Sequence, residues 1–270
     1  MRFARCALMG ALFTASFMSA AHADLVVTAP GVIQNGGITD VIAAFTKSTG
    51  VKVKLNSAGM GPSANSVDAT GDKATDVVFL PEEPNNLMGN VAMGGGLKGG
   101  YVPVGRVLFG LAVRAGDPHP DISTPEKFVA VLKGAKEVMI SNWKAASPGY
   151  IYTGKYLAPA KGTLVAKVIY DMLQRPEFAG VHSTASTDGE GGESLGKGHG
   201  DMALQAVCEI INHPEISLVG VVPDQFYLHI DMAVAVGAHA NDEKDAKAFV
   251  AFATGPQAAP LWKAKGINPF

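Results

Sequence analysis

LVVTAPGVIQNGGITDVIAAFTKSTGVKVKL, residues 25–55, is the stretch that decides the fold class of this 270-residue chain. Its first part, the apolar run 25–29, is followed by a Pro-Gly pair and predicts a buried parallel strand. Residues 38–48 place apolar side chains at helical spacing, and Gly50 stands where a helix commonly ends. VKVKL at 51–55 alternates and predicts a second strand. A strand, a helix and a strand in this order predict a βαβ unit with a parallel sheet.

The same series continues downstream. A glycine-rich turn at 57–61 leads into a predicted helix near 63–70, and TDVVFL at 75–80 predicts a third strand. GGGLKGG at 94–100 is typical of a flexible loop. A long apolar extended segment at 101–114 then ends the first α/β series.

A second α/β series follows this segment. Thr124-Pro125-Glu126 predicts a helix start, with the threonine as N-cap and proline at the first helical position. The other expected elements are strands at 137–141, 201–207 and 216–222, a helix just after the turn at 145–149, a helix at 163–175, an extended segment at 229–237, and helices near 242–253 and 256–265.

Two long extended segments, near 103–113 and 229–237, predict two lobes, because a chain must cross twice to enter a second lobe and return. We expect residues 24–105 and 226–270 to form lobe I and residues 106–225 to form lobe II. The alternative is one doubly wound sheet. Both alternatives belong to the α/β fold class.

The N-terminus is typical of a secretory signal peptide spanning residues 1–23. Arg2 and Arg5 precede the apolar stretch 6–20, and Ala21-His22-Ala23 gives the small-x-small pattern of a cleavage site. The apolar stretch is shorter than the roughly 20 residues that span a bilayer. We therefore expect an exported, periplasmic protein whose mature chain begins at Asp24, with a retained N-terminal anchor as the alternative.

Composition and motifs argue against several function classes. The chain carries 22 basic and 24 acidic residues with no basic run, so nucleic acid is not an expected partner. Cys208 is the one cysteine after the predicted cleavage site, so no intrachain disulfide is expected, and we predict a buried small hydrophobe. The chain has no Walker lysine, GxGxxG, HExxH or GxSxG motif, and its histidines lack ligand spacing. We expect no metal and no cofactor.

Four glycine-rich turns join a strand to a helix, at 30–31, 57–63, 147–149 and 188–194. Ligands of open α/β sheets sit beyond the carboxyl ends of strands, where helix N-termini can hold anions through free amide hydrogens. Two turns fall in each lobe, so a cleft between the lobes would hold a small anion from both sides. The candidate ligand-binding residues are Gly31, Ser57, Gly59, Gly61, Ser147, Gly149, Tyr150, Tyr152, Gly192 and Gln205.

Several motifs, taken in order, resemble the type II periplasmic solute-binding proteins, specifically their molybdate-binding-like branch. The opening stretch resembles that branch's first strand, loop, helix and "TGVKV" second strand, and ATDVVFL at 74–80 resembles its "ADV" third strand. KGHGDMAL at 197–204 is similar to "GEADAGI", and residues 246–267 resemble the C-terminal signature of that branch. The resemblance implies a two-lobed fold with a ligand cleft between the lobes, a monomer, and an inner-membrane transporter as a partner.

The chain departs from molybdate binders at two positions. Its first strand-to-helix loop reads Ala29-Pro30-Gly31-Val32 where the family usually has a serine, and the position of a usual tyrosine falls near Ala206. Both departures remove oxyanion donors, so we expect a di- or tricarboxylate rather than molybdate. The segments SPGYIY at 147–152 and Gln205 to Glu209 instead resemble a sub-branch similar to the exported aconitate isomerases.

Two functional hypotheses follow. In the first, the protein captures a small anion, most plausibly an organic carboxylate, between its lobes and delivers it to a transporter. In the second, the same cleft isomerises aconitate by removing a proton from one carbon and returning it two carbons away, which needs only positioned acid and base groups. For this reaction Glu209 and Tyr152 are the candidate catalytic residues, with Lys144 as a further candidate near the cleft.

Overall fold

The computed structural model describes residues 24–142, 155–156, 163–187 and 189–270. The predicted signal peptide and the predicted turn at 145–149 lie outside these residues. Within the described part of the chain, no helix has the length and apolar character needed to cross a membrane.

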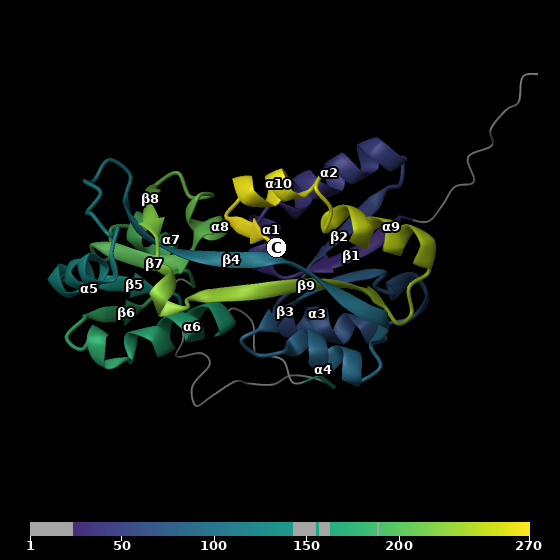
Figure 1. Ribbon diagram of the computed structural model, residues 1–270, viewed down its shortest axis with the longest axis horizontal. Helices are drawn as coiled ribbons and strands as arrows, with labels where there is room; N and C mark the ends of the chain where they lie inside the picture. Colours follow the sequence, from purple (N-terminus) through teal and green to yellow (C-terminus); the bar gives the residue numbers. More distant parts are fainter. Residues whose placement is uncertain (1–23, 143–154, 157–162, 188) are drawn as a thin grey trace, which may run out of the picture.

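The first lobe is built on a sheet whose strands lie in the order β2–β1–β3–β9–β4 (Figure 1). The predicted βαβ unit is confirmed, because β1 pairs in parallel with both β2 and β3. Strand β9 is antiparallel to β3 and β4, and the C-terminal β10 pairs with the middle of β4. These strands are β1 (Leu25–Ala29), β2 (Val53–Ser57), β3 (Val77–Glu83), β4 (Leu97–Arg114), β9 (His229–Gly237) and β10 (Ile267–Pro269).

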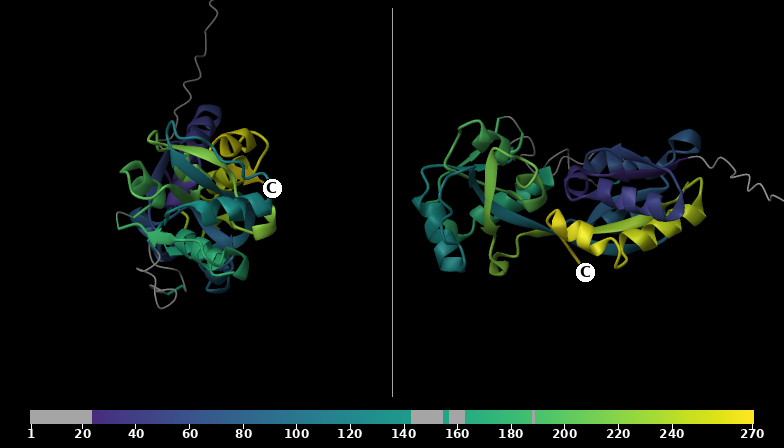
Figure 2. Two further views of the ribbon diagram at one scale, coloured as in Figure 1. Left: turned by 90° about the vertical axis from the view of Figure 1, so that its left-hand side faces the viewer. Right: turned by 90° about the horizontal axis from the view of Figure 1, so that it is seen from above.

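Strand β4 runs out of the first lobe and into the second, as Figure 2 shows. Its residues up to Leu108 pair with β9, whereas those from Phe109 onward pair with β7 and β8. Strands β5, β6 and β7 pair in parallel. The strands of the second lobe are β5 (Val138–Ile140), β6 (Ser183–Ala185), β7 (Met202–Ala206) and β8 (Ile216–Val221).

The two-lobed fold predicted from the extended segments is confirmed (Figure 1). The segment at 101–114 lies in β4, which pairs with strands of both lobes, and the segment at 229–237 is β9, which runs beside β4 as far as Leu108. The connection from β8 to β9 includes a short helix, η5 (Asp224–Phe226). The lobe boundaries at 105/106 and 225/226 stay a prediction.

Helices cover both faces of the first sheet and surround the second (Figure 1). The N-terminal and C-terminal helices α2, α9 and α10 lie on one face of the first sheet, and α3 and α4 lie on the other. The helices are α1 (Gly31–Asn35), α2 (Ile38–Thr49), α3 (Met60–Asn65), η1 (Ser66–Asp68), η2 (Gly71–Lys73), α4 (Leu87–Met93), α5 (Pro125–Gly134), α6 (Thr163–Leu173), η4 (Pro176–Phe178), α7 (Gly191–Gly196), α8 (Val207–Ile210), α9 (Glu243–Ala253) and α10 (Ala259–Ala264).

Buried aromatic rings fix the C-terminal helices to the first sheet. The ring of Phe45 in α2 meets Phe249 in α9 edge-on, with centroids 5.0 Å apart, and Phe79 in β3 contacts the ring of Trp262 in α10 at 6.0 Å. Edge-to-face pairs of this kind stabilise a core beyond the area they bury. The C-terminal helices therefore pack on the first lobe, as the sequence predicts.

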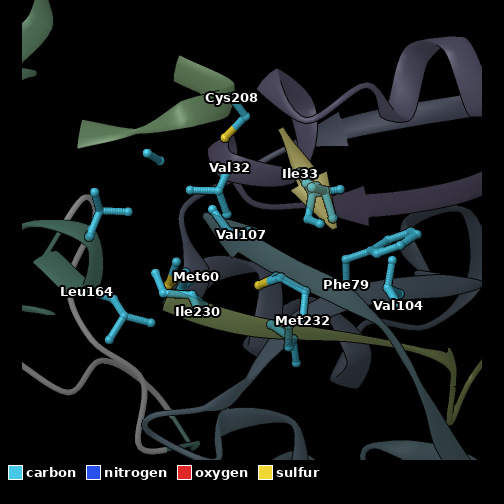
Figure 3. Packing of buried hydrophobic residues seen from close by; sticks show 14 of the residues in the cluster. Val32, Ile33, Met60, Phe79, Val104, Val107, Leu164, Cys208, Ile230 and Met232 are labelled. Atoms are coloured by element: carbon cyan, nitrogen blue, oxygen red, sulfur yellow. The ribbon is translucent and has the colours of Figure 1, made fainter. Parts of the chain in front are cut away.

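One hydrophobic cluster extends across both lobes. Figure 3 shows Met60 of α3, Ile230 of β9 and Leu164 of α6 among its members. Cys208 also belongs to this cluster and is fully buried, so the prediction that it is a small buried hydrophobe is confirmed. Burial raises the pKa of its thiol well above the ordinary value.

Short elements account for the differences between the predicted and observed structure. Strand β4 begins at Leu97, inside the predicted loop 94–100, because Leu97 pairs with Gly237 of β9. The left-handed backbone of Gly99 (φ 93°) accommodates the register shift between Leu97 and Tyr101. Helix α1 begins at Gly31, where the sequence predicts a plain turn. Strands β6 and β10 have three residues each, too few for a periodic pattern.

Residues 155–156, which lie between β5 and α6 of the second lobe, pack against the first lobe. The side chain of Tyr156 is buried, its ring lies so close to Gly94 and Gly96 that a Cβ at either glycine would collide with it, and its hydroxyl donates to Asp68 at 2.8 Å. Lys155 Nζ lies 3.1 Å from the same carboxylate. The lobes are therefore joined by a side-chain contact as well as by the two crossings.

Tyr156→Ala should destabilise the protein by about 3 kcal/mol, because it removes a buried aromatic ring and leaves a cavity beside two glycines. The matched control is Tyr227→Ala, since Tyr227 is 77% exposed and should tolerate truncation within about 0.5 kcal/mol. Urea unfolding monitored by circular dichroism measures both. Equal midpoints for the two variants would show that the Tyr156 contact contributes nothing.

Candidate cleft between the lobes

A cavity of about 440 Å³ opens between the lobes. Residues from the first lobe form most of its lining, and α6, α7 and α8 of the second lobe supply the rest. The first-lobe residues are Pro30, Gly31, Val32, Gln34, Ser57, Ala58, Gly59, Met60 and Pro62, and the second-lobe residues are Val165, Glu190 and Glu209.

The first-lobe wall is formed where β1 and β2 end and helices α1 and α3 begin. Because β1 and β2 are parallel, their carboxyl ends lie at the same edge of the sheet, and Ala29 pairs with Ser57 in register. Gln34 connects the two turns: its Nε2 donates to the carbonyl of Ala29 at 2.9 Å, and its Oε1 accepts from the Ser57 hydroxyl at 2.6 Å. This wall offers hydroxyl, amide and backbone groups to a ligand.

The second-lobe wall contributes two carboxyl groups. Glu190 is the N-cap residue of α7, and Glu209 lies in the first turn of α8 directly after β7. Glu209 is 7% exposed, whereas the Glu190 side chain is 37% exposed. One carboxyl group is therefore buried at the back of the cleft and the other borders solvent.

A buried amide holds the two carboxyl groups in place. Gln205 Nε2 donates to Glu190 Oε2 at 2.7 Å and to Glu209 Oε2 at 3.0 Å. Its Oε1 accepts from the backbone N–H of Gly192 at 2.6 Å. A Cβ at Gly192 would lie 3.0 Å from that oxygen, so the close approach favours glycine there.

Burial and the neighbouring charge of Glu190 together raise the pKa of Glu209 from 4.5 to about 8. Hydrogen bonds from Gln205 and from the backbone at Ala206 oppose this change but do not cancel it. The Glu209 carboxyl is therefore mostly protonated at pH 7 and can donate a hydrogen bond into the cleft.

The structure brings part of the predicted site together. Gly31, Ser57, Gly59 and Glu209 line the cavity. Gly192 and Gln205 lie behind the second-lobe wall and act through Glu190 and Glu209. Gly61 is buried within the first turn of α3, next to the lining residues. Ser147, Gly149, Tyr150, Tyr152 and Lys144 lie outside the described residues, so their roles stay predictions.

Two polar lining residues, Glu190 and Gln34, are absent from the sequence prediction. Glu190 falls inside the predicted turn 188–194, whose glycines and serine are the groups that the sequence marks as ligand contacts. Gln34 lies three residues after Gly31. Because these residues form the short helix α1, the side chain of Gln34 reaches the Ser57 hydroxyl. The described lining contains no lysine, arginine or histidine. Among the described residues, no three histidine, cysteine or acidic side chains form a group that could hold a metal ion.

Comparison with known proteins identifies the class to which this two-lobed fold and interlobe cleft belong. Residues 25–268 match the family model of the bacterial extracellular solute-binding proteins, and the chain belongs to this family. Its fold is that of the periplasmic molybdate-binding proteins: it superposes on the one from Azotobacter vinelandii with a TM-score of 0.61, at 20% identity, over 90% of this chain and 98% of that chain.

Two further relatives are similar over most of their length. The chain is 25% identical over 250 residues to an aconitate isomerase from a Pseudomonas species, covering 90% of this chain and 88% of that protein. It also superposes on Peb3 of Campylobacter jejuni with bound L-phospholactate, with a TM-score of 0.60 at 14% identity, over 92% of this chain and all of that one.

The raised pKa of Glu209 predicts a stability that depends on pH. The folded protein binds this proton more tightly than the unfolded chain, so the stabilisation is fully present below about pH 4.5 and is lost as the pH rises to about 8. Glu209→Gln cannot lose this proton. The natural protein should lose roughly 4 kcal/mol of this stabilisation between pH 5 and pH 8.5 and the variant none, so the melting temperature of Glu209→Gln relative to the natural protein should rise by roughly 8–16 °C over that range.

Glu193→Gln is the matched control, because Glu193 lies on the outside of α7 and pairs with Lys197 at 2.8 Å. Differential scanning calorimetry across this pH range compares the three proteins. If the melting temperatures of the natural protein and Glu209→Gln change with pH in parallel, Glu209 titrates in its ordinary range.

Proposed function

We propose that the cleft binds a small organic carboxylate, with Glu209 as a neutral hydrogen-bond donor to one of its carboxylate groups. The observation that carries this proposal is the buried carboxyl group of Glu209 at the back of the cavity. A protonated carboxyl group can donate to an anion without adding charge to the wall. The backbone amides at the two helix starts of the first lobe would supply donors to the other end of the ligand.

The small number of donors at the first turn favours an elongated carboxylate over molybdate. A compact tetrahedral dianion needs many short donors at one point, and the first turn offers Gly31 where a serine would donate. Molybdate would lose two hydrogen bonds here, one from the missing first-loop serine and one from the tyrosine that is missing near Ala206. The absence of two hydrogen bonds to a charged ligand costs on the order of 3–6 kcal/mol, which is several powers of ten in affinity.

A second function, the isomerisation of aconitate, is favoured by one further observation. Glu209 is a carboxyl group with a pKa near neutrality in a ligand cleft, as a general acid or base requires. The similarity to an aconitate isomerase supports the same reaction. Incubation of the purified protein with trans-aconitate, followed by chromatography for cis-aconitate, tests this activity directly.

Location and partners follow from the family. We infer a periplasmic protein, exported by the predicted signal peptide, that acts as a monomer. In the binding role it would pass its ligand to an inner-membrane transporter, whereas the isomerase role requires no partner.

Titration calorimetry with citrate, both aconitate isomers, molybdate and tungstate should give heats of binding for at least one carboxylate and weak or no heats for the two oxyanions. Tight binding of molybdate with no response to any carboxylate would contradict the proposed ligand class.

Gly31→Leu should weaken carboxylate binding at least tenfold while leaving the fold intact. A Cβ at Gly31 meets no atom within 4 Å, so the leucine would project into the cavity without disturbing the core. Gly134→Leu is the matched control, because that glycine is equally unobstructed and lies at the exposed end of α5. Binding that is unchanged in Gly31→Leu would place the ligand elsewhere.

A further inference from the structure

We propose that Glu190 and Glu209 form an acid–base pair that moves a proton between two carbons of the bound carboxylate, with Gln205 and His213 as positioning residues. The pair rests on the proposed binding of an organic carboxylate in this cleft. It assigns Glu190 as the base and Glu209 as the acid.

The first support is the way in which Gln205 holds both carboxyl groups. The amide is fully buried, and its oxygen accepts from the backbone N–H of Gly192. A rotated amide would place its NH₂ group against that N–H and its oxygen against two carboxyl groups. The orientation is therefore fixed, and each of the two amide hydrogens serves one carboxyl group.

The second support is that the two carboxyl groups have different surroundings while lining one cavity. Two neighbouring carboxyl groups disfavour a state in which both are ionised, because their charges repel. Burial and this repulsion favour the protonated form of Glu209, whereas the side chain of Glu190 is 37% exposed and reaches solvent. Pairs whose environments separate their proton affinities supply the acid and the base of many active sites.

The third support comes from His213, whose imidazole lies close to the same Glu190 oxygen that accepts from Gln205. His213 Nε2 lies 3.4 Å from Glu190 Oε2, and its side chain is 29% exposed. His213 offers a path for a proton from Glu190 to solvent. The other titratable groups near this set are Glu215, 3.9 Å from His213 Nδ1, and the buried thiol of Cys208.

The reaction balances without an oxidant or a reductant. Glu190 takes a proton from a methylene carbon of the ligand, so a C–H bond breaks, an O–H bond forms, and the electron pair is delocalised over the allylic carbons and the adjacent carboxyl group. Glu209 then gives its proton to the carbon two positions away. After one turnover the proton lies on Glu190 instead of Glu209. Loss of that proton through His213 and uptake of one by Glu209 from water restore the pair.

Because the proton gained by the ligand comes from Glu209, the ligand should acquire deuterium when the reaction is run in D₂O. The probe is trans-aconitate, analysed by proton NMR and mass spectrometry, with binding measured in parallel by calorimetry. The natural protein and Glu193→Gln should incorporate deuterium at the same rate. Glu190→Gln and Glu209→Gln should bind trans-aconitate but incorporate deuterium about 100-fold more slowly or less.

The outcomes separate the two proposals. If trans-aconitate does not bind to the natural protein, the proposed ligand class fails, and the acid–base pair fails with it. If trans-aconitate binds but gains no deuterium and forms no isomer, the pair alone is overturned. The pair is also overturned if either glutamine variant exchanges at the natural rate.

His213→Asn tests the positioning role separately. Without the imidazole, the proton taken up by Glu190 should return to solvent more slowly, so turnover of trans-aconitate should fall while the affinity stays the same, and added imidazole should restore part of the turnover. Unchanged turnover, or a loss of affinity in place of turnover, would overturn the role assigned to His213.

Discussion

Strand β4 belongs to the sheets of both lobes, and the position of every group in the cleft depends on this pairing. Its first half is held by β9 and β10, and its second half by β7 and β8. At the point where it passes from one lobe to the other, Arg106 makes a two-point ion pair with Asp231 of β9, at 2.7 and 2.9 Å. The backbone register of one strand thus sets how the carboxyl ends of β1 and β2 face the start of α8.

The chemistry of the cleft follows from the contrast between its two walls. The first lobe supplies neutral donors, while the second lobe supplies two carboxyl groups joined by one buried amide. Two ionised carboxylates would oppose an anionic ligand, and burial resolves this conflict by keeping Glu209 protonated. The same proton that allows an anion to bind is available for transfer, so binding and proton transfer to a carboxylate would use one arrangement of residues.

The sequence predicts the parts of this structure that depend on local pattern. The apolar run at 25–29 and the alternation at 51–55 predict parallel strands, and parallel strands place Gly31 and Ser57 at one edge. The orientation of Gln205 could not be predicted, because it depends on a backbone N–H in another element, at Gly192. Glu190 belongs to no periodic sequence pattern that would mark it as a lining residue. The contact of Tyr156 with Asp68 joins residues 88 positions apart. Such contacts are set by the tertiary fold, which no short sequence pattern encodes.

The central claim is that Glu209 is a neutral acid in the cleft at physiological pH. Carbon-13 NMR of protein labelled at its glutamate side-chain carboxyl carbons measures this directly in the absence of any ligand. We predict one carboxyl resonance with a midpoint near pH 8 that is missing from Glu209→Gln. A spectrum in which every glutamate titrates below about pH 6 would contradict the account.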